Sequence, residues 1–371
     1  MTNAEEVNIT GTKQSAKCIT KAIFIIKYKN SFTIELLILQ LSINLKSILV
    51  SEEMRALLFS ALVAVIMAFA SARPTWRDLE NNYTFENFLA DFKMSLAKDS
   101  AEFATRKFAF LSELVRVRLH NQSGKSWKEG INKYSAMTAD EKQAFFGRSK
   151  GVDRSHKPMN LKTPTTVMKN VSELFESVDW RSAGIVNAVK DQGHCGSCWS
   201  FSATSVIESH VAKQSGLLMD LSVEQIAMCS PNPDSCGGTG GCHGATAELA
   251  LDYVANSRGI FSEYQYSYQG YYGVENACKT KEMYVQPAAK IGGFVQLPQN
   301  DYAALMNAVA SEGPIAISVD ASTWHAYESG IYNGCNQVNP DIDHAVVLVG
   351  YGVDNGQKYW TVRNSWYNTT T

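Results

Sequence analysis

Apolar positions recur at helical spacing through residues 83–121, a stretch that contains neither Gly nor Pro. This period predicts helical structure with one apolar face. The same reasoning predicts a helix from Cys198 to about Gln214 and another over residues 245–257. The side chains that mark the first face are Phe85, Phe88, Phe92, Leu96, Phe103, Phe110, Leu114 and Val117.

Strand patterns dominate the chain from Ala288 onward. Apolar runs rich in Val and Ile predict strands at 315–321, 344–353 and 358–366, with a helix near 301–311. A helical half followed by a strand-rich half favours an α+β fold with two lobes and a cleft between them.

The first 72 residues carry a targeting pattern that starts at Met54 rather than Met1. Arg55, an apolar run from Leu57 to Phe69 and the small residues 70–72 are typical of a secretory signal peptide. Residues 1–53 show no amphipathic order, so we expect 1–53 to be a non-native extension and 54–72 to be the signal peptide. The alternative is a signal anchor with a cytosolic tail.

Charge is distributed unevenly behind this signal. Residues 73–171 carry 18 Lys/Arg and 11 Asp/Glu, a net +7, whereas residues 172–371 carry 9 Lys/Arg and 20 Asp/Glu, a net −11. The basic residues form no run, so nucleic acid is not an expected partner, and an intramolecular contact is favoured. Two unrelated solvated surfaces remain the alternative. Residues 148–172 are polar and basic, with Pro158 and Pro164, which predicts an extended linker.

Among the chain's eight cysteines, Cys198 lies in a sequence pattern that indicates a reactive thiol. In the run 192–201, QGHCGSCWSF, Cys198 follows a Gly-containing loop and begins a predicted helix. A helix N-terminus stabilises a thiolate through its N–H groups and partial positive charge. Cys198 is therefore the candidate nucleophile, although a structural disulfide or a redox or zinc pair with Cys195 is an alternative. Seven cysteines follow the signal, and an odd number leaves at least one thiol free.

A thiolate nucleophile needs a base nearby in space. Seven histidines are candidates, and His344 differs from the others because it follows Asp343 and opens an apolar strand. Asn364 lies near the end of the next predicted strand. Pairing of these strands could bring the Asn364 amide to the His344 ring and orient it.

These segments, CGSCW above all, resemble the papain and cathepsin family of cysteine peptidases, and in particular its cathepsin L type. The resemblance covers residues 83–366. It implies a two-lobed fold with a helical lobe and a β-barrel-like lobe, and an endopeptidase with Cys198, His344 and Asn364 as catalytic residues. Gln192 would contribute to an oxyanion hole, and Trp366 would shield the His344–Asn364 hydrogen bond. The resemblance also implies disulfides joining Cys195 to Cys242 and Cys229 to Cys278, whereas Cys236 is additional. The substrate-binding residues that it implies are Gly196, Gly244, Ala245, Thr246, Ala247, Ser318, Ile342, Ala345 and Trp366.

The resemblance further implies that residues 73–171 form a helical inhibitory propeptide and residues 172–371 the peptidase domain. Glu113 stands where the family usually has Asn, and Ala136 where it usually has an acid. The propeptide residues that match the family pattern are Glu102, Arg106, Phe110, Val117, Asn121, Gly130, Asn132 and Tyr134.

The last residues depart from the family pattern, because Tyr367 stands where Gly is usual and the family continues with further barrel strands. We therefore expect a truncated peptidase domain with an incomplete strand-rich lobe. The alternative function is an inactive homologue whose propeptide inhibits related peptidases. Expected partners are protein and peptide substrates and the chain's own propeptide, with no cofactor, no metal and no stable membrane insertion. The expected location is the secretory pathway, with a lysosome, a vacuole or the outside of the cell as the destination.

Overall fold

The computed structural model describes residues 79, 82–148, 159–163 and 167–366. The sequence predictions for residues 1–53 and 54–72 lie outside these residues. No helix among the described residues is long and apolar enough to cross a membrane.

The N-terminal part is built on two helices, α4 (Phe85–Asp91) and α5 (Ala101–Gln122). The prediction of helical structure throughout 83–121 is wrong in one respect, since a break separates the two helices. Lys93 adopts a left-handed conformation (φ 52°) just after α4, and the Ser100 side chain accepts a hydrogen bond from the Phe103 N–H to start α5. The helices share an apolar core to which Phe85, Phe88, Phe110, Leu114 and Val117 all contribute.

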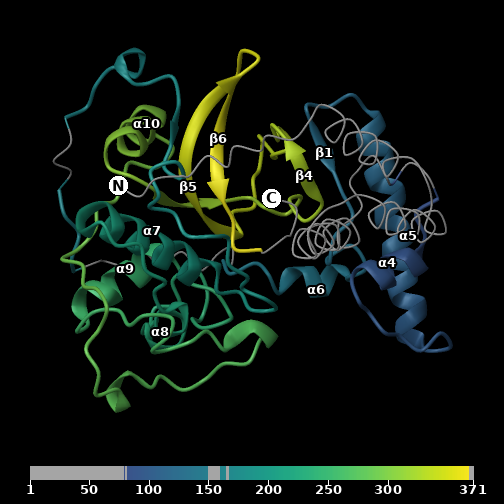
Figure 1. Cartoon of the computed structure of the whole chain (residues 1–371), viewed down its shortest axis with the longest axis horizontal. Coiled ribbons are helices and arrows are strands. Elements are labelled where there is room, and N and C mark those ends of the chain that lie inside the picture. Colours follow the sequence, from purple (N-terminus) through teal and green to yellow (C-terminus); the bar gives the residue numbers. More distant parts are fainter. Residues whose placement is uncertain (1–78, 80–81, 149–158, 164–166, 367–371) are drawn as a thin grey trace, which may run out of the picture. The chain divides into compact units, whose positions relative to one another are not determined.

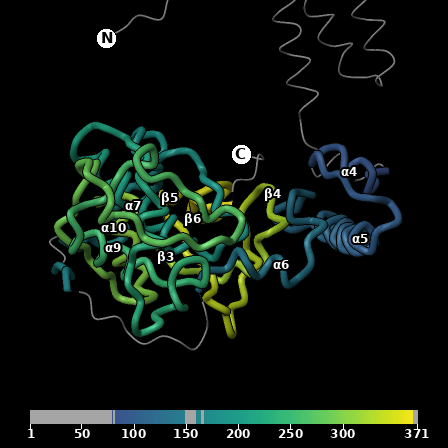
Figure 2. The backbone as a smooth tube through the Cα atoms, turned by 90° about the horizontal axis from the view of Figure 1, so that it is seen from below, coloured from purple at the N-terminus to yellow at the C-terminus, as the bar shows by residue number. Residues whose placement is uncertain are grey.

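A short strand and helix connect this core to the rest of the chain. Strand β1 (Trp127–Glu129) pairs antiparallel with β4 (Tyr327–Gly330), about two hundred residues later in the chain. Helix α6 (Ala139–Gln143) follows, and its Glu141 forms an ion pair with Arg106 of α5. Figure 2 follows the chain from α5 past α6 towards the strands.

The predicted propeptide residues contribute to these contacts. Arg106 lies 3.8 Å from Glu102, as the four-residue spacing predicts, but it bonds more closely to Glu141. The Asn121 amide exchanges hydrogen bonds of 2.8 and 2.9 Å with the backbone of Glu129. Gly130 donates its N–H to the carbonyl of Ala326.

Three helices form the helical lobe, namely α7 (Cys198–Ser215), α8 (Val223–Cys229) and α9 (Ala247–Asn256). Buried residues of all three, such as Ile207, Ile226 and Leu249, share one core. The predicted disulfides Cys195–Cys242 and Cys229–Cys278 are both present. Short 3₁₀ turns occur at Val171–Glu173, Gly270–Tyr272 and Thr280–Glu282.

The second lobe contains an open sheet and one helix, α10 (Tyr302–Ser311). Strand β5 (His344–Asp354) lies at its centre and pairs antiparallel with β2 (Val178–Asp179), β3 (Ile315–Val319) and β6 (Gln357–Arg363) (Figure 1). The described strands do not close into a barrel. Helix α7 packs against β5, where the Ser202 hydroxyl donates to the Val346 carbonyl. The cleft between lobes that the sequence predicts therefore begins at the first residues of α7 and β5.

Two phenylalanines of α5 allow a test of how much the N-terminal core contributes to the stability of this part of the chain. Phe110 is fully buried, whereas Phe108 is 76% exposed on the same helix. We expect Phe110→Ala to destabilise this part by about 3–5 kcal/mol, because it removes a large buried side chain and leaves a cavity. Phe108→Ala is the matched control and should change the free energy of unfolding by less than about 0.5 kcal/mol. Urea unfolding of the full chain measures both, and equal shifts in the two variants would contradict the packing described here.

Candidate active site

Cys198 is the first residue of α7 and is fully buried. The loop before it is held by the Cys195–Cys242 disulfide and by the Gly196 N–H, which donates to the Cys242 carbonyl at 2.9 Å. Gly193 turns this loop with φ 63°, and a Cβ there would collide with the Tyr271 carbonyl. The loop therefore brings the thiol to a helix N-terminus, where backbone N–H groups have no partner within the helix.

His344 and Asn364 meet as the strand pattern predicts. Strands β5 and β6 pair with Val347 opposite Arg363, so that Asn364 follows the end of β6 close to the start of β5. The His344 Nε2 lies 2.7 Å from the Asn364 Oδ1. The Ala345 N–H donates to the Cys198 Sγ at 3.4 Å, which places the imidazole one residue from the thiol.

Trp366 covers this pair, as expected. Its ring centroid is 4.5 Å from that of His344, and the Trp366 side chain is itself buried. The His344 Nδ1 is buried and has no hydrogen-bond partner among the described residues. The ring is thus oriented by one nitrogen, and the other remains available for a proton.

The Gln192 side chain is held in one orientation by its neighbours. Its Oε1 accepts a hydrogen bond from the Ser365 hydroxyl at 2.6 Å, and its backbone N–H donates to the Ser365 carbonyl. The amide Nε2 donates to the carbonyls of Phe145 (2.8 Å) and Cys195 (2.9 Å). A backbone carbonyl from the N-terminal part of the chain therefore occupies a donor that lies beside Cys198.

The chain at Phe145–Arg148 crosses directly over Cys198. The backbone of Gly147 hydrogen-bonds to the Cys198 Sγ, and its carbonyl accepts the Ala245 N–H at 3.2 Å. A Cβ on Gly147 would lie 2.7 Å from the Sγ and 2.2 Å from the Gly196 carbonyl, so only glycine fits. The next side chain, Arg148, donates to the Ser318 hydroxyl at 2.7 Å.

The Phe145–Arg148 segment removes the Cys198 thiol and the His344 imidazole from water, and burial keeps both groups neutral. Burial raises the pKa of the Cys198 thiol to about 11, against hydrogen bonds from Ala345, Gly147 and Trp199 that lower it, and the charge of Asp343 adds to the rise. Burial lowers the pKa of His344 to about 4, and the hydrogen bond to Asn364 opposes this shift. Both directions are those of groups removed from water.

The predicted substrate-binding residues fall into two sets. Gly196, Gly244, Ala245, Ser318 and Ala345 all contact Cys198 or the Phe145–Arg148 segment. Thr246 and Ala247 instead begin α9, where the Thr246 hydroxyl accepts the Leu249 N–H. Ile342 is half-buried beside β5, and no contact places it at the crossing segment.

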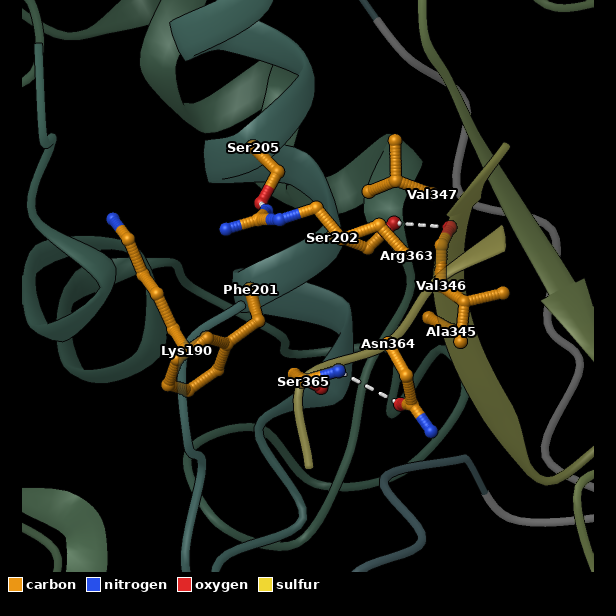
Figure 3. Close-up of a pocket in the computed structure, with 10 residues that line it drawn as sticks. All are labelled: Lys190, Phe201, Ser202, Ser205, Ala345, Val346, Val347, Arg363, Asn364 and Ser365. Atoms are coloured by element: carbon orange, nitrogen blue, oxygen red, sulfur yellow. Dashed lines mark hydrogen bonds between the residues drawn. The ribbon is translucent and has the colours of Figure 1, made fainter. Parts of the chain in front are cut away.

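Sequence reasoning missed Phe145, Gly147 and Arg148, which occupy the cleft, and Arg363 behind it. Arg363 donates from β6 to the Ser205 hydroxyl and the Ala188 carbonyl, and burial lowers its pKa. Arg363 and Asn364 line a cavity of about 10 Å³ between α7 and β5. Figure 3 shows these two side chains with others that line the cavity. The one available signal for the first group is the pair of aromatic residues followed by glycine at 145–147.

A cysteine and a histidine buried under the chain's own N-terminal part define a cysteine protease precursor. Comparison with known proteins agrees, because residues 174–370 match the papain family of cysteine proteases. Cathepsin L1 of Drosophila melanogaster is 34% identical over 287 residues, which cover 73% of this chain and 74% of the fly protein. Procathepsin L of Rattus norvegicus is 35% identical over 271 residues, which cover 70% of this chain and 76% of the rat protein.

Solved structures give the same result. A recombinant stem bromelain precursor matches with a TM-score of 0.64 and 31% identity, covering 76% of this chain and 86% of that one. The digestive procathepsin L 3 of the Tenebrio molitor larval midgut matches with a TM-score of 0.62 and 32% identity, covering 79% of this chain and 90% of that one. This chain therefore belongs to the papain family of cysteine proteases, as a cathepsin L-type endopeptidase precursor with a propeptide. The alternative of an inactive inhibitory homologue is not favoured.

The raised pKa of Cys198 predicts an unreactive thiol in the precursor. Iodoacetamide at pH 6 should alkylate Cys198 more than about a hundredfold faster after the propeptide is removed, because only the thiolate reacts appreciably. The exposed thiol of Cys335 is the internal control and should react at a similar rate in both forms. Peptide mapping by mass spectrometry measures each rate, and equal labelling of Cys198 in both forms would contradict the burial argument.

Proposed function

We propose that Cys198 is the nucleophile of this endopeptidase, that His344 is its acid and base, and that Asn364 orients the imidazole. The observation that carries the assignment is the meeting of all three at one point, with Ala345 bonded to the Sγ and Asn364 bonded to the His344 ring. The reaction is hydrolysis of a peptide bond through a covalent thioester.

The chemistry follows from these positions. The thiol proton passes to His344, and the Cys198 sulfur attacks the scissile carbonyl carbon to form a tetrahedral oxyanion. Gln192 Nε2 and the N–H of Cys198 stabilise this oxyanion. His344 then donates its proton to the leaving amine, which departs and leaves an acyl-enzyme. Water, deprotonated by His344, attacks the thioester and releases the acid product and the free thiol.

Residues 73–171 act as the inhibitory propeptide and residues 172–371 as the peptidase domain in this proposal. Three contacts support it, namely the Gln192 amide on the Phe145 carbonyl, Gly147 on the Cys198 Sγ and Arg148 on Ser318. Gly196, Gly244, Ala245, Ser318 and Ala345 would bind a substrate in the place of this segment. The remaining expected residues, Thr246, Ala247, Ile342 and Trp366, would form the outer walls.

We assign the protein to the secretory pathway, with residues 54–72 as its signal peptide. Two disulfides support this location, because such bonds persist in oxidising compartments.

The oxyanion assignment predicts a large loss of rate. Gln192→Ala should lower kcat by about 10²–10³, because it removes one donor to the transition state. Cys198→Ala should abolish turnover and covalent labelling by an epoxide probe. Cys335→Ser is the matched control, since this exposed thiol lies outside the site, and it should keep wild-type kinetics. A fluorogenic dipeptide assay after acid treatment of each precursor measures all three, and turnover or precursor conversion by Cys198→Ala would refute the nucleophile.

The ion pair of Arg106 with Glu141 predicts acid activation. The hydrogen bond from Arg106 lowers the pKa of Glu141 from 4.5 to about 2. A lowered carboxyl pKa stabilises the folded propeptide fully above pH 4.5, and this stabilisation is lost as pH falls towards 2. Lys133 also pairs with Asp191 across the interface between the propeptide and the peptidase domain. Self-processing should therefore accelerate as pH falls below 4.5 towards 2.

Glu141→Gln separates this effect from general acid sensitivity. The variant should process faster at pH 6 than wild type and show a weaker pH dependence, whereas its exposed neighbour Asp140→Asn should behave as wild type. Gel assays of precursor conversion at pH 6 and pH 3 give the rates. Identical pH profiles for Glu141→Gln and wild type would contradict the role of this pair.

A further inference from the structure

A second imidazole lies beside the catalytic residues and takes no part in the mechanism above. His325 is 7% exposed and stacks on Trp366, with ring centroids 4.6 Å apart and an angle of 14° between the planes. Its Nε2 is buried and has no hydrogen-bond partner among the described residues. A buried polar atom without a partner is costly, so a substrate group that hydrogen-bonds to it would be favoured.

The propeptide shows which part of the cleft this imidazole faces. The Phe145 carbonyl occupies the Gln192 amide, and the Phe145 ring packs against His325 (6.1 Å), His194 (5.1 Å) and Trp366 (6.3 Å). Gly147 lies against Cys198 and bonds to Ala245 at the other end of the crossing segment. The two histidines thus flank one side of Cys198, and Ala245 lies towards the other.

The position of His344 identifies this side as that of the leaving group. The leaving amine must receive its proton from His344, so it departs on the side where the His344 ring lies. The ring centroids of Trp366 and His344 are 4.5 Å apart, and the His325 ring stacks on the same Trp366 ring. Residues after the scissile bond would therefore pass between His325 and His194 once Phe145 has left.

We propose that His325 and His194 form a subsite that binds a carboxylate on the residue following the scissile bond. The inference rests on the proposed function and adds a preference on the leaving-group side to it. Two imidazolium groups that both lie beside the place of the Phe145 ring suit a carboxylate, which accepts hydrogen bonds with both oxygens. An Asp or Glu side chain and the terminal carboxylate of a short substrate both supply this group, and paired peptides distinguish the two sources.

The groups around the two histidines set the pH range of this preference. In the precursor, burial lowers the pKa of His325 to about 3, with the charges of Lys142 and His344 adding to this and Glu113 opposing it. Lys142 and Glu113 belong to the propeptide and leave with it. Burial, together with Asp320 and Asp341, raises the pKa of Asp343 to about 7, so this acid beside His344 does not compete as a carboxylate at lower pH.

Removal of the propeptide uncovers the buried His325 imidazole, whereas His194 is already exposed in the precursor. A solvated histidine is charged below a pH of about 6.5, and substrate carboxylates are charged above a pH of about 4. Asp191, on the loop of His194, loses Lys133 at the same time and remains bonded to the Gly193 N–H. The preference for a carboxylate should therefore appear between about pH 4.5 and pH 6 and vanish at pH 7.5.

Pairs of internally quenched peptides test the subsite in the acid-processed full chain. The peptides differ only after the scissile bond, with Asp against Asn in one pair, and with a free carboxylate against a carboxamide in a second pair that ends at this residue. At pH 5 we expect kcat/KM to favour the carboxylate by about tenfold in at least one pair, as for a charge pair in a partly solvated site. At pH 7.5 the ratio should approach one. The pair that shows the preference identifies the source of the carboxylate.

Variants assign the preference to its residues. His325→Gln and His194→Gln should each reduce the Asp/Asn or acid/amide ratio at pH 5 while leaving kcat/KM for the neutral peptide within about threefold, because neither ring takes part in bond making. His243→Gln is the matched control. Its exposed side chain lies near Glu275, and this variant should keep the wild-type ratio.

The outcomes separate this inference from the proposed function. A neutral peptide that is cleaved by wild type and not by Cys198→Ala, with a ratio near one at pH 5 in both pairs, would overturn the subsite alone. A preference that survives the His325→Gln, His194→Gln double variant would do the same. Failure to cleave any peptide would overturn the proposed function and this inference with it.

Discussion

The close approach of the Gly147 backbone to the Cys198 sulfur is the contact on which the rest of the precursor depends. Two residues earlier the Phe145 carbonyl accepts from the Gln192 amide, and the Gly147 backbone bonds to the thiol and to the Ala245 N–H. A side chain at position 147 would collide with the Gly196 carbonyl and the Sγ, so the contact requires glycine. Because these hydrogen bonds are made by backbone groups, the propeptide occupies the Gln192 amide and the Ala245 N–H while it covers the Cys198 thiol.

Such a contact is kept only if the propeptide is itself folded, since ordering a free segment costs conformational entropy at every residue. The core of α4 and α5 supplies that fold. Strand β1 then extends a ladder with β4, and the Trp127 ring packs on Tyr332 with its indole N–H bonded to Asn333. The Asn132 amide donates to the His325 carbonyl. These contacts lie between the helical core and the cleft, and they fix where Phe145–Arg148 must cross.

Local patterns in the sequence predicted the parts of this structure that depend on neighbours along the chain. The start of α7 at Cys198 and the strands β5 and β6 follow from period and composition, and strand pairing brings Asn364 to His344. The break at residues 92–100 was missed because the sequence there contains neither Gly nor Pro and keeps apolar residues at helical spacing, although Lys93 adopts a left-handed conformation. The roles of Phe145, Gly147 and His325 could not be predicted, since each depends on contacts across roughly fifty to two hundred residues, and no periodicity encodes these.

Activation is an electrostatic change as well as the removal of a steric block. In the precursor the pKa of the Cys198 thiol, about 11, lies far above the pKa of the His344 imidazole, about 4, so the proton stays on sulfur. Burial causes both shifts, and they have opposite signs because burial disfavours the charged form of each group. Exposure to water therefore moves the two values towards each other. The helix N-terminus then favours the thiolate and Asn364 favours the imidazolium, so the loss of a neutral glycine backbone is enough to create the charged pair that the chemistry requires.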